Sequence, residues 1–329
     1  MAKLKLSVAV GDYDRTRALI GGSVAIDGVD PVYMTLVPEE IFFRAIRAAE
    51  FDICELSLSS YTMKTAQGNS PYIAVPAFLS RTFRHNAVYV RADRVRKPAD
   101  LKGRTVGVPE YQVTANVWVR AFLEDDYGVK PADIHWIRGG IEEPGRLEKL
   151  ALKLPVGVRL DDAPAGATIS ALLEAGEIDG FIAPRPPKLV APSRPEIAWL
   201  FADPIAVAKD YFKRTGFFPI MHVLGVRREL AERHPWLPGA VFKAFVQAKA
   251  LAVQRLADTA AASVTLPFVE ETLKDARAAM GEDFWSYGVG PNRKVLDYFL
   301  GQHHAQGLSS RPVSVEELFH PATYETFKV

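Results

Sequence analysis

The spacing of apolar and polar residues predicts strands and helices in alternation from the start of the chain. Residues 4–10 alternate as in a half-buried strand. A proline and two acids at 38–40 mark the start of a helix, whose apolar face recurs at positions 41, 42, 45, 46 and 49. Residues 73–79, IAVPAFL, are apolar throughout, as in a strand covered on both faces. The pattern therefore predicts an α/β fold.

A second α/β region follows. Residues 105–108 predict a strand, residues from Val113 onward a helix, and residues 134–137 another strand. Thr168 is the expected cap of a further helix. An apolar strand within 217–226 returns the chain to a mainly helical last third. We therefore expect two lobes, with lobe 1 formed by residues 1–90 and 225–329 and lobe 2 by residues 91–224.

Composition narrows the class of protein. The chain has 329 residues, of which 48% are apolar, so it can form two domains with ample cores. A net charge of +1 argues against a nucleic-acid partner. The chain shows neither the long apolar run of a membrane span nor the apolar core of a signal peptide, and its one cysteine cannot form an internal disulfide. We expect a cytoplasmic protein with no membrane partner; the oligomeric state, a homo-oligomer included, stays open.

The basic segment 80–85, SRTFRH, follows the apolar strand directly. Ligands of open α/β sheets gather at the carboxyl ends of the strands, and a guanidinium can grip a carboxylate with two parallel hydrogen bonds. We therefore predict that Arg81 and Arg84 bind an anion, with structural ion pairs as the alternative. Arg15, after the first strand, and Arg185, in a proline-rich loop, are further candidates. A helix-start ion pair and an exposed loop position are their respective alternatives.

Two histidines are candidate proton carriers. Imidazole titrates near neutral pH, so His85 and His222 can each take or give a proton, although a histidine with a purely structural role is the alternative for both. Glu110 or Tyr111 can substitute for either. Ser57, Ser59 and Thr114 can bind ligand oxygens, with ordinary turn capping as the alternative for the two serines.

Motifs for other chemistries are absent from the sequence. No His-Glu-x-x-His spacing occurs, Cys54 stands alone, and neither a phosphate loop nor a dinucleotide fingerprint is present. The serines lack the G-x-S-x-G context of a nucleophile. We expect no metal and no cofactor, although the sequence does not decide whether Glu55, His85 and His222 assemble a metal site in space.

Several segments together indicate a family. They are GDYDR at 11–15, ELSLSSY at 55–61, SRTFRH at 80–85, GVPEYQVTA at 107–115 and PIMH at 219–222. With them the chain resembles the 4,5-dihydroxyphthalate decarboxylases over nearly its whole length. The resemblance implies the type II fold of the periplasmic solute-binding proteins, with two lobes, a mixed sheet flanked by helices in each, and a ligand cleft between them.

The resemblance also implies a reaction, the conversion of 4,5-dihydroxyphthalate to 3,4-dihydroxybenzoate (protocatechuate) and carbon dioxide in phthalate degradation. Arg81 and Arg84 would clamp a carboxylate of this small aromatic dicarboxylate. His85 and His222 would act as acid and base, in an order that the sequence does not assign. Two alternatives stay open: a non-catalytic binding protein for an aromatic or dicarboxylic anion, and a decarboxylase for another hydroxylated aromatic acid.

Overall fold

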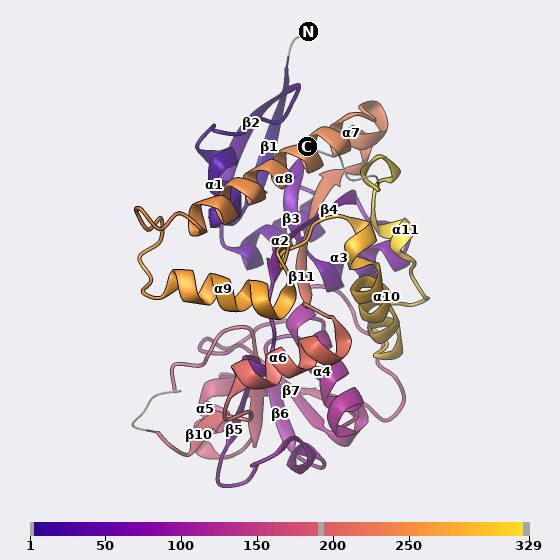
Figure 1. The fold of residues 1–329 in the computed structure, drawn as a ribbon. Helices are drawn as coiled ribbons and strands as arrows, with labels where there is room; N and C mark the ends of the chain where they lie inside the picture. Colours follow the sequence, from indigo (N-terminus) through magenta and orange to yellow (C-terminus); the bar gives the residue numbers. More distant parts are fainter. Residues whose placement is uncertain (1–2, 190–193, 325–329) are drawn as a thin grey trace. The chain divides into compact units, whose positions relative to one another are not determined.

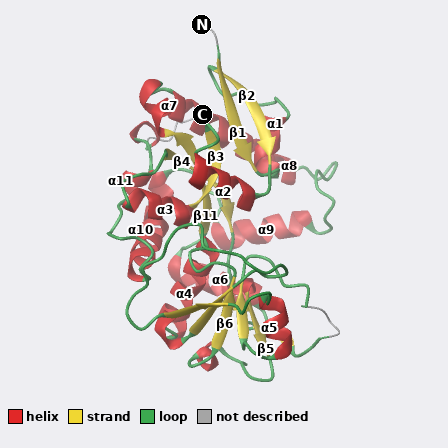
Figure 2. Cartoon of the chain, turned by 180° about the vertical axis from the view of Figure 1, so that it is seen from behind, coloured by secondary structure: helices red, strands yellow, loops and turns green. Residues whose placement is uncertain are grey.

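The computed structural model describes residues 3–189 and 194–324 and divides the chain into two compact units (Figure 1). The first unit comprises Met1–Arg81, Ile220–Asp297 and Val313–Val329, and the second comprises Thr82–Pro219 and Tyr298–Pro312. Each unit contains one mixed sheet with helices beside it (Figure 2). Among the helices of the described residues, none has the length and apolar character needed to cross a membrane.

The sheet of the first unit has the strand order β2-β1-β3-β11-β4. Its strands are β1 (Leu4–Val10), β2 (Val29–Thr35), β3 (Ile53–Ser57), β4 (Tyr72–Arg81) and β11 (Ile220–Arg227). The helices of this unit are α1 (Asp14–Ile20), α2 (Pro38–Ala48), α3 (Leu58–Ala66), α7 (Arg228–Arg233), α8 (Leu237–Leu256), α9 (Val269–Met280) and α11 (Val315–Leu318). Helix α10 (Val289–Ala305) begins in the first unit and ends in the second.

Strand direction brings one set of strand ends together. β1 runs parallel to β2 and β3, whereas β11 runs antiparallel to its neighbours β3 and β4. The carboxyl ends of β1, β3 and β4 therefore meet the beginning of β11 at one end of the sheet. Ligands of open α/β sheets bind at this carboxyl end.

The sheet of the second unit has the order β10-β5-β9-β6-β7-β8. Its strands are β5 (Val88–Arg91), β6 (Thr105–Val108), β7 (His135–Arg138), β8 (Arg159–Asp162), β9 (Gly180–Ile182) and β10 (Ile197–Trp199), and its helices are α4 (Thr114–Tyr127), α5 (Ile169–Ala175) and α6 (Pro204–Thr215). Thr168 caps α5 as predicted, because its side chain accepts a hydrogen bond from the Ala171 N–H. A Cβ on Gly107 would lie 2.6 Å from Ile169 Cγ2, so β6 needs glycine at this contact with α5.

The unit boundaries differ from those expected for the lobes. β5 pairs with β9 and β10, so the second unit begins at Thr82 rather than after residue 90. Residues 298–312 also belong to the second unit, although the whole helical end was expected in lobe 1. Part of the proline-rich loop, residues 190–193, lies outside the described residues.

Candidate active site

Polar side chains from distant parts of the first unit lie at this carboxyl end of the sheet. Residues after β1, at the ends of β3 and β4, and near the start of β11 contribute to it. They are Tyr13, Arg15, Glu55, Ser57, Arg81 and His222. Four of these, Arg15, Ser57, Arg81 and His222, were predicted as site residues.

Glu55 is fully buried and lies at the centre of this group. Its carboxylate is 2.5 Å from His222 Nδ1, and it accepts hydrogen bonds from the Tyr13 hydroxyl at 3.0 Å and the Gly11 N–H at 3.1 Å. A buried carboxylate requires such partners because burial otherwise disfavours its charge. Burial and the charge of Glu55 raise the pKa of Tyr13 well above its usual range, so its hydroxyl stays a hydrogen-bond donor.

His222 is held on three sides. The pairing of β11 with β4 is irregular on both sides of His222, a distortion that often re-aims a side chain near an active site. The ring of Phe42 meets the imidazole edge-on, with centroids 4.7 Å apart. Nδ1 is occupied by Glu55, which leaves Nε2 as the nitrogen for a ligand. The His222 side chain is 17% exposed.

Arg15 is fixed between two aromatic rings. Its guanidinium carbon lies 4.2 Å from the ring centroid of Tyr13 and 4.7 Å from that of Trp285. Nε donates to the Leu79 carbonyl at 2.7 Å, and Nη1 forms an ion pair with Asp14 at 3.1 Å. The structure thus contains the ion pair that was the alternative for Arg15, within a cage that also orients the guanidinium.

The other predicted residues of the first unit are buried. Arg81 donates from Nη1 to the Ser286 carbonyl at 2.9 Å, and burial lowers its pKa to about 10, so the guanidinium stays charged at neutral pH. Ser57 ends β3 and Ser59 lies in the first turn of α3. Both serines are buried.

The second unit holds the remaining candidates. Arg84 donates to the Pro184 carbonyl at 3.4 Å, and burial, with a smaller effect of Arg185, lowers its pKa to about 10. Arg185 itself is exposed. Thr114 begins α4 and is buried, which is the position expected for it.

His85 lies in an aromatic cluster of the second unit. Its ring stacks on Phe122 with centroids 4.3 Å apart and also meets Phe201 and Tyr211. Neither ring nitrogen has a hydrogen-bond partner in the part of the chain that the structure describes. Burial lowers the pKa of His85 to about 4, so the ring is neutral at pH 7. These surroundings favour a packing role for His85 over the predicted proton transfer.

Glu110 and Tyr111 are also engaged in the interior of the second unit. The Glu110 carboxylate forms ion pairs with Arg146 at 2.7 Å and Lys149 at 2.6 Å. The Arg120 guanidinium lies 3.7 Å from the ring centroid of the fully buried Tyr111. Both arrangements favour structural roles, because each side chain already has close partners.

The sequence analysis missed several residues of the first-unit site. Glu55 was not among the predicted site residues, although an acidic residue between the apolar Cys54 and Leu56 is a signal for a buried, partnered charge. Tyr13 belonged to the segment GDYDR that indicated the family, but it had no predicted role. Trp285 and Tyr287 were not predicted as site residues, because no local pattern distinguishes them.

Solved structures show which fold the chain has. The alkanesulfonate-binding protein SsuA from Xanthomonas axonopodis pv. citri matches with a TM-score of 0.53 and 15% identity, over 98% of each chain. A protein of Bordetella bronchiseptica matches with a TM-score of 0.55 and 20% identity, over 98% of this chain and 96% of the other. The chain therefore has the periplasmic-binding-protein fold that was predicted.

Curated relatives define the family more narrowly. No family model matches the chain. The 4,5-dihydroxyphthalate decarboxylase of Comamonas testosteroni is 62% identical over 330 residues, which cover all of both chains. That of Pseudomonas putida is 56% identical over 218 residues, 66% of this chain and 84% of the relative. The chain belongs to the 4,5-dihydroxyphthalate decarboxylase family, and the predicted resemblance is confirmed.

Proposed function

We propose that this protein is a carboxy-lyase that converts 4,5-dihydroxyphthalate to 3,4-dihydroxybenzoate and carbon dioxide. The full-length identity of 62% with a relative of that name carries the proposal. The Glu55–His222 pair and Arg15, which lies between two aromatic rings, support the proposal. They place a proton carrier and an anion-binding group at the carboxyl end of one sheet.

The chemistry of the substrate explains why such groups are needed. Direct loss of carbon dioxide from an aromatic carboxylate leaves an in-plane carbanion that the ring cannot delocalise. Each carboxylate of this substrate is para to a hydroxyl. Removal of the phenolic proton moves electrons to the carboxylate-bearing carbon, which takes up a proton and becomes tetrahedral. The carbon–carbon bond then breaks, its electrons restore the aromatic ring, and the phenolate regains its proton.

We assign the removal of the phenolic proton to His222 Nε2. Glu55 holds Nδ1 at 2.5 Å and can stabilise the imidazolium that forms, as the carboxylate of a catalytic triad does. Tyr13 and the Gly11 N–H in turn hold Glu55. Such positioned acid–base groups typically contribute about 10²–10⁴-fold to a rate.

Arg15 is the group we assign to a substrate carboxylate. The rings of Tyr13 and Trp285 fix the plane of its guanidinium, so little freedom is lost when it binds an anion. Arg81 and Arg84 stay predicted anion contacts, each in its own unit.

Turnover by the purified chain tests the proposal. Incubation with 4,5-dihydroxyphthalate in heavy water should yield 3,4-dihydroxybenzoate with one deuterium at the carbon that lost its carboxylate. His222→Gln should lower kcat by about 10²-fold or more while substrate binding changes little, because the amide cannot carry a proton. His304→Gln, at an exposed position in α10 outside this group, is the control. Tight binding of the diacid without product would leave the binding-protein alternative.

Two finer points accompany the proposal. We place the reaction in the degradation of phthalates, after a step that adds two hydroxyls to the ring, because the substrate carries them para to its carboxylates. The cytoplasmic location stays a prediction, which fractionation of cells that express the protein can test.

A further inference from the structure

The hydroxyl of Tyr287 has no hydrogen-bond partner among the described residues. Tyr287 is only 4% exposed, and it lies in the segment between α9 and α10, in the first unit. Buried tyrosine hydroxyls nearly always find a partner, because an unpaired polar group away from water destabilises the fold. Tyr33, Tyr111 and Tyr211 also have unpaired hydroxyls among the described residues, and Tyr287 is the one on which the charges of Arg15, Glu55 and Arg81 act.

The segment that carries Tyr287 is fastened along β4, an edge strand of the first sheet. Carbonyl groups of β4 accept hydrogen bonds from the Gly288 N–H at 2.9 Å and from Trp285 Nε1 at 2.9 Å. Ser286 accepts from Arg81, the last residue of the strand. These contacts cover part of the edge and place Trp285 on the Arg15 guanidinium.

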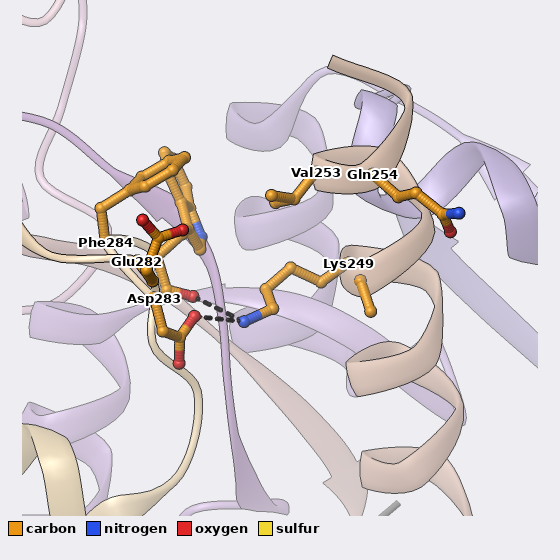
Figure 3. A pocket seen from close by; sticks show the side chains of 8 residues that line it. Lys249, Val253, Gln254, Glu282, Asp283 and Phe284 are labelled. Atoms are coloured by element: carbon orange, nitrogen blue, oxygen red, sulfur yellow. Dashed lines mark hydrogen bonds and ion pairs between the residues drawn. The ribbon is translucent and has the colours of Figure 1, made fainter. Parts of the chain in front are cut away.

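Helix α8 holds the same segment through Lys249. The ammonium group donates to Asp283 Oδ1 at 2.6 Å and to the Trp285 carbonyl at 3.2 Å, across a hollow of about 370 Å³ between α8 and residues 282–285 (Figure 3). It also lies 5.4 Å from the ring centroid of Tyr287. The backbone on which Tyr287 sits is thus fixed before any ligand arrives.

The surroundings of the hydroxyl determine what it can bind. Burial raises its pKa well above the usual range, and the charges of Arg15, Glu55, Arg81 and Asp14 also act on it. The group therefore keeps its proton and acts as a donor. Asp14 and Glu55 already have partners in Arg15 and His222, so the two arginines favour an anionic acceptor. Ligand sites enclose most of the ligand's surface, so a donor shielded from water suits such a site.

We propose that the Tyr287 hydroxyl donates a hydrogen bond to a carboxylate oxygen of the substrate, next to Arg15. The inference rests on the proposed function for the identity of the substrate. Tyr287 is then a binding residue of the same site, and its missing partner is the ligand.

Tyr287→Phe tests this inference, because it removes only the hydroxyl. Calorimetric titration should use phthalate, which has both carboxylates and no hydroxyl, and catechol, which has both hydroxyls and no carboxylate. We expect the affinity for phthalate to fall by about tenfold or more, as for loss of a hydrogen bond to a charged group, and the affinity for catechol to stay the same. A loss for catechol alone, unchanged affinity for both, or a wild-type protein that does not bind phthalate overturns the inference.

A matched control is available in the same unit. Tyr33 of β2 also has a hydroxyl without a partner among the described residues, and burial alone raises its pKa to about 12, with no charged group acting on it. Tyr33→Phe should leave phthalate binding unchanged. Neither variant should lower the Tm, because neither loses a hydrogen bond within the protein.

Binding requires no turnover, so the two proposals can fail separately. A protein that binds phthalate through Tyr287 but never releases carbon dioxide would disprove the proposed function and leave this inference standing. Normal turnover with unchanged phthalate affinity in Tyr287→Phe would overturn this inference alone.

Discussion

Glu55 and His85 are both buried titratable residues, but their surroundings differ. Glu55 contacts an imidazole, a phenol and a backbone N–H, so its carboxylate is compensated without contact with water. His85 contacts aromatic rings and has no hydrogen-bond partner in the described chain. A polar network of the first kind suits proton transfer, whereas the second kind keeps an imidazole neutral.

The neutral state of His85 predicts acid sensitivity. Its pKa of about 4 lies below the ordinary value of 6.5, so the unfolded chain binds more protons, and stability falls as pH drops from about 6.5 toward 4. At about 1.4 kcal/mol per pH unit, the loss reaches about 3 kcal/mol. In His85→Phe this dependence should flatten, as urea unfolding across this range would show. Parallel curves for variant and wild type throughout the range would mean that His85 does not titrate as described.

Single residues could be predicted from the sequence where the chemistry was local. His222 and Arg15 were candidates because their side chains suit proton transfer and anion binding next to expected strands. The partnership of Glu55 with His222 could not be predicted, because it joins residues 167 positions apart through the pairing of β3 with β11. The role proposed for Tyr287 could not be predicted, because it depends on an unpaired hydroxyl on which charged groups of the site act, and both are properties of the folded chain.

The turn between β1 and α1 links backbone geometry to the candidate site. Gly11 donates its N–H to Glu55, and the Tyr13 ring packs over it. A Cβ at Gly11 would lie 2.4 Å from Tyr13 Cζ and 2.6 Å from its hydroxyl oxygen. Only glycine therefore allows the ring to reach Glu55 in this position.

Gly11→Ala should displace the Tyr13 ring and break its hydrogen bond to Glu55. The clash involves the far end of a side chain, so the fold should survive with a Tm close to that of the wild type. We expect kcat to fall by about tenfold, the scale of one lost hydrogen bond to a charged group. Tyr13→Phe removes the same hydrogen bond without the clash, and the two variants should have similar kcat. Full activity in Gly11→Ala would show that Tyr13 is dispensable.

Elements with strong periodicity could be predicted, and weakly patterned ones could not. α2 begins at Pro38 and buries Ile41, Phe42, Ala45 and Ile46 as expected, whereas Ala49, expected on the same face, is the half-buried residue that caps the end of the helix. β2 was not predicted, because Pro31 interrupts it and because, in this edge strand, every residue after Val29 is exposed or only partly buried. The position of β5 in the second sheet depends on pairing with β9 and β10, which a one-dimensional pattern does not contain.

Cys54 is the one cysteine of the chain, and the reactivity of its thiol can be used to follow the opening of the first sheet. It is fully buried in β3, and burial raises the pKa of its thiol well above the usual range. A thiol reagent such as DTNB should therefore react only when the sheet opens. 3,4-Dihydroxybenzoate at 100 times its Kd should slow the reaction about 100-fold, because binding stabilises the closed sheet. An unchanged rate at saturating ligand would place the binding site away from this unit.

The insertion of β11 between β3 and β4 has a consequence for synthesis on the ribosome. The six strands of the second sheet all leave the ribosome before residue 220, whereas the first sheet stays open along β3 and β4 until residues 220–227 follow. The nascent chain must therefore carry two unpaired strand edges through the translation of more than a hundred residues. Because exposed edges favour aggregation, this interval is when the chain most needs a chaperone.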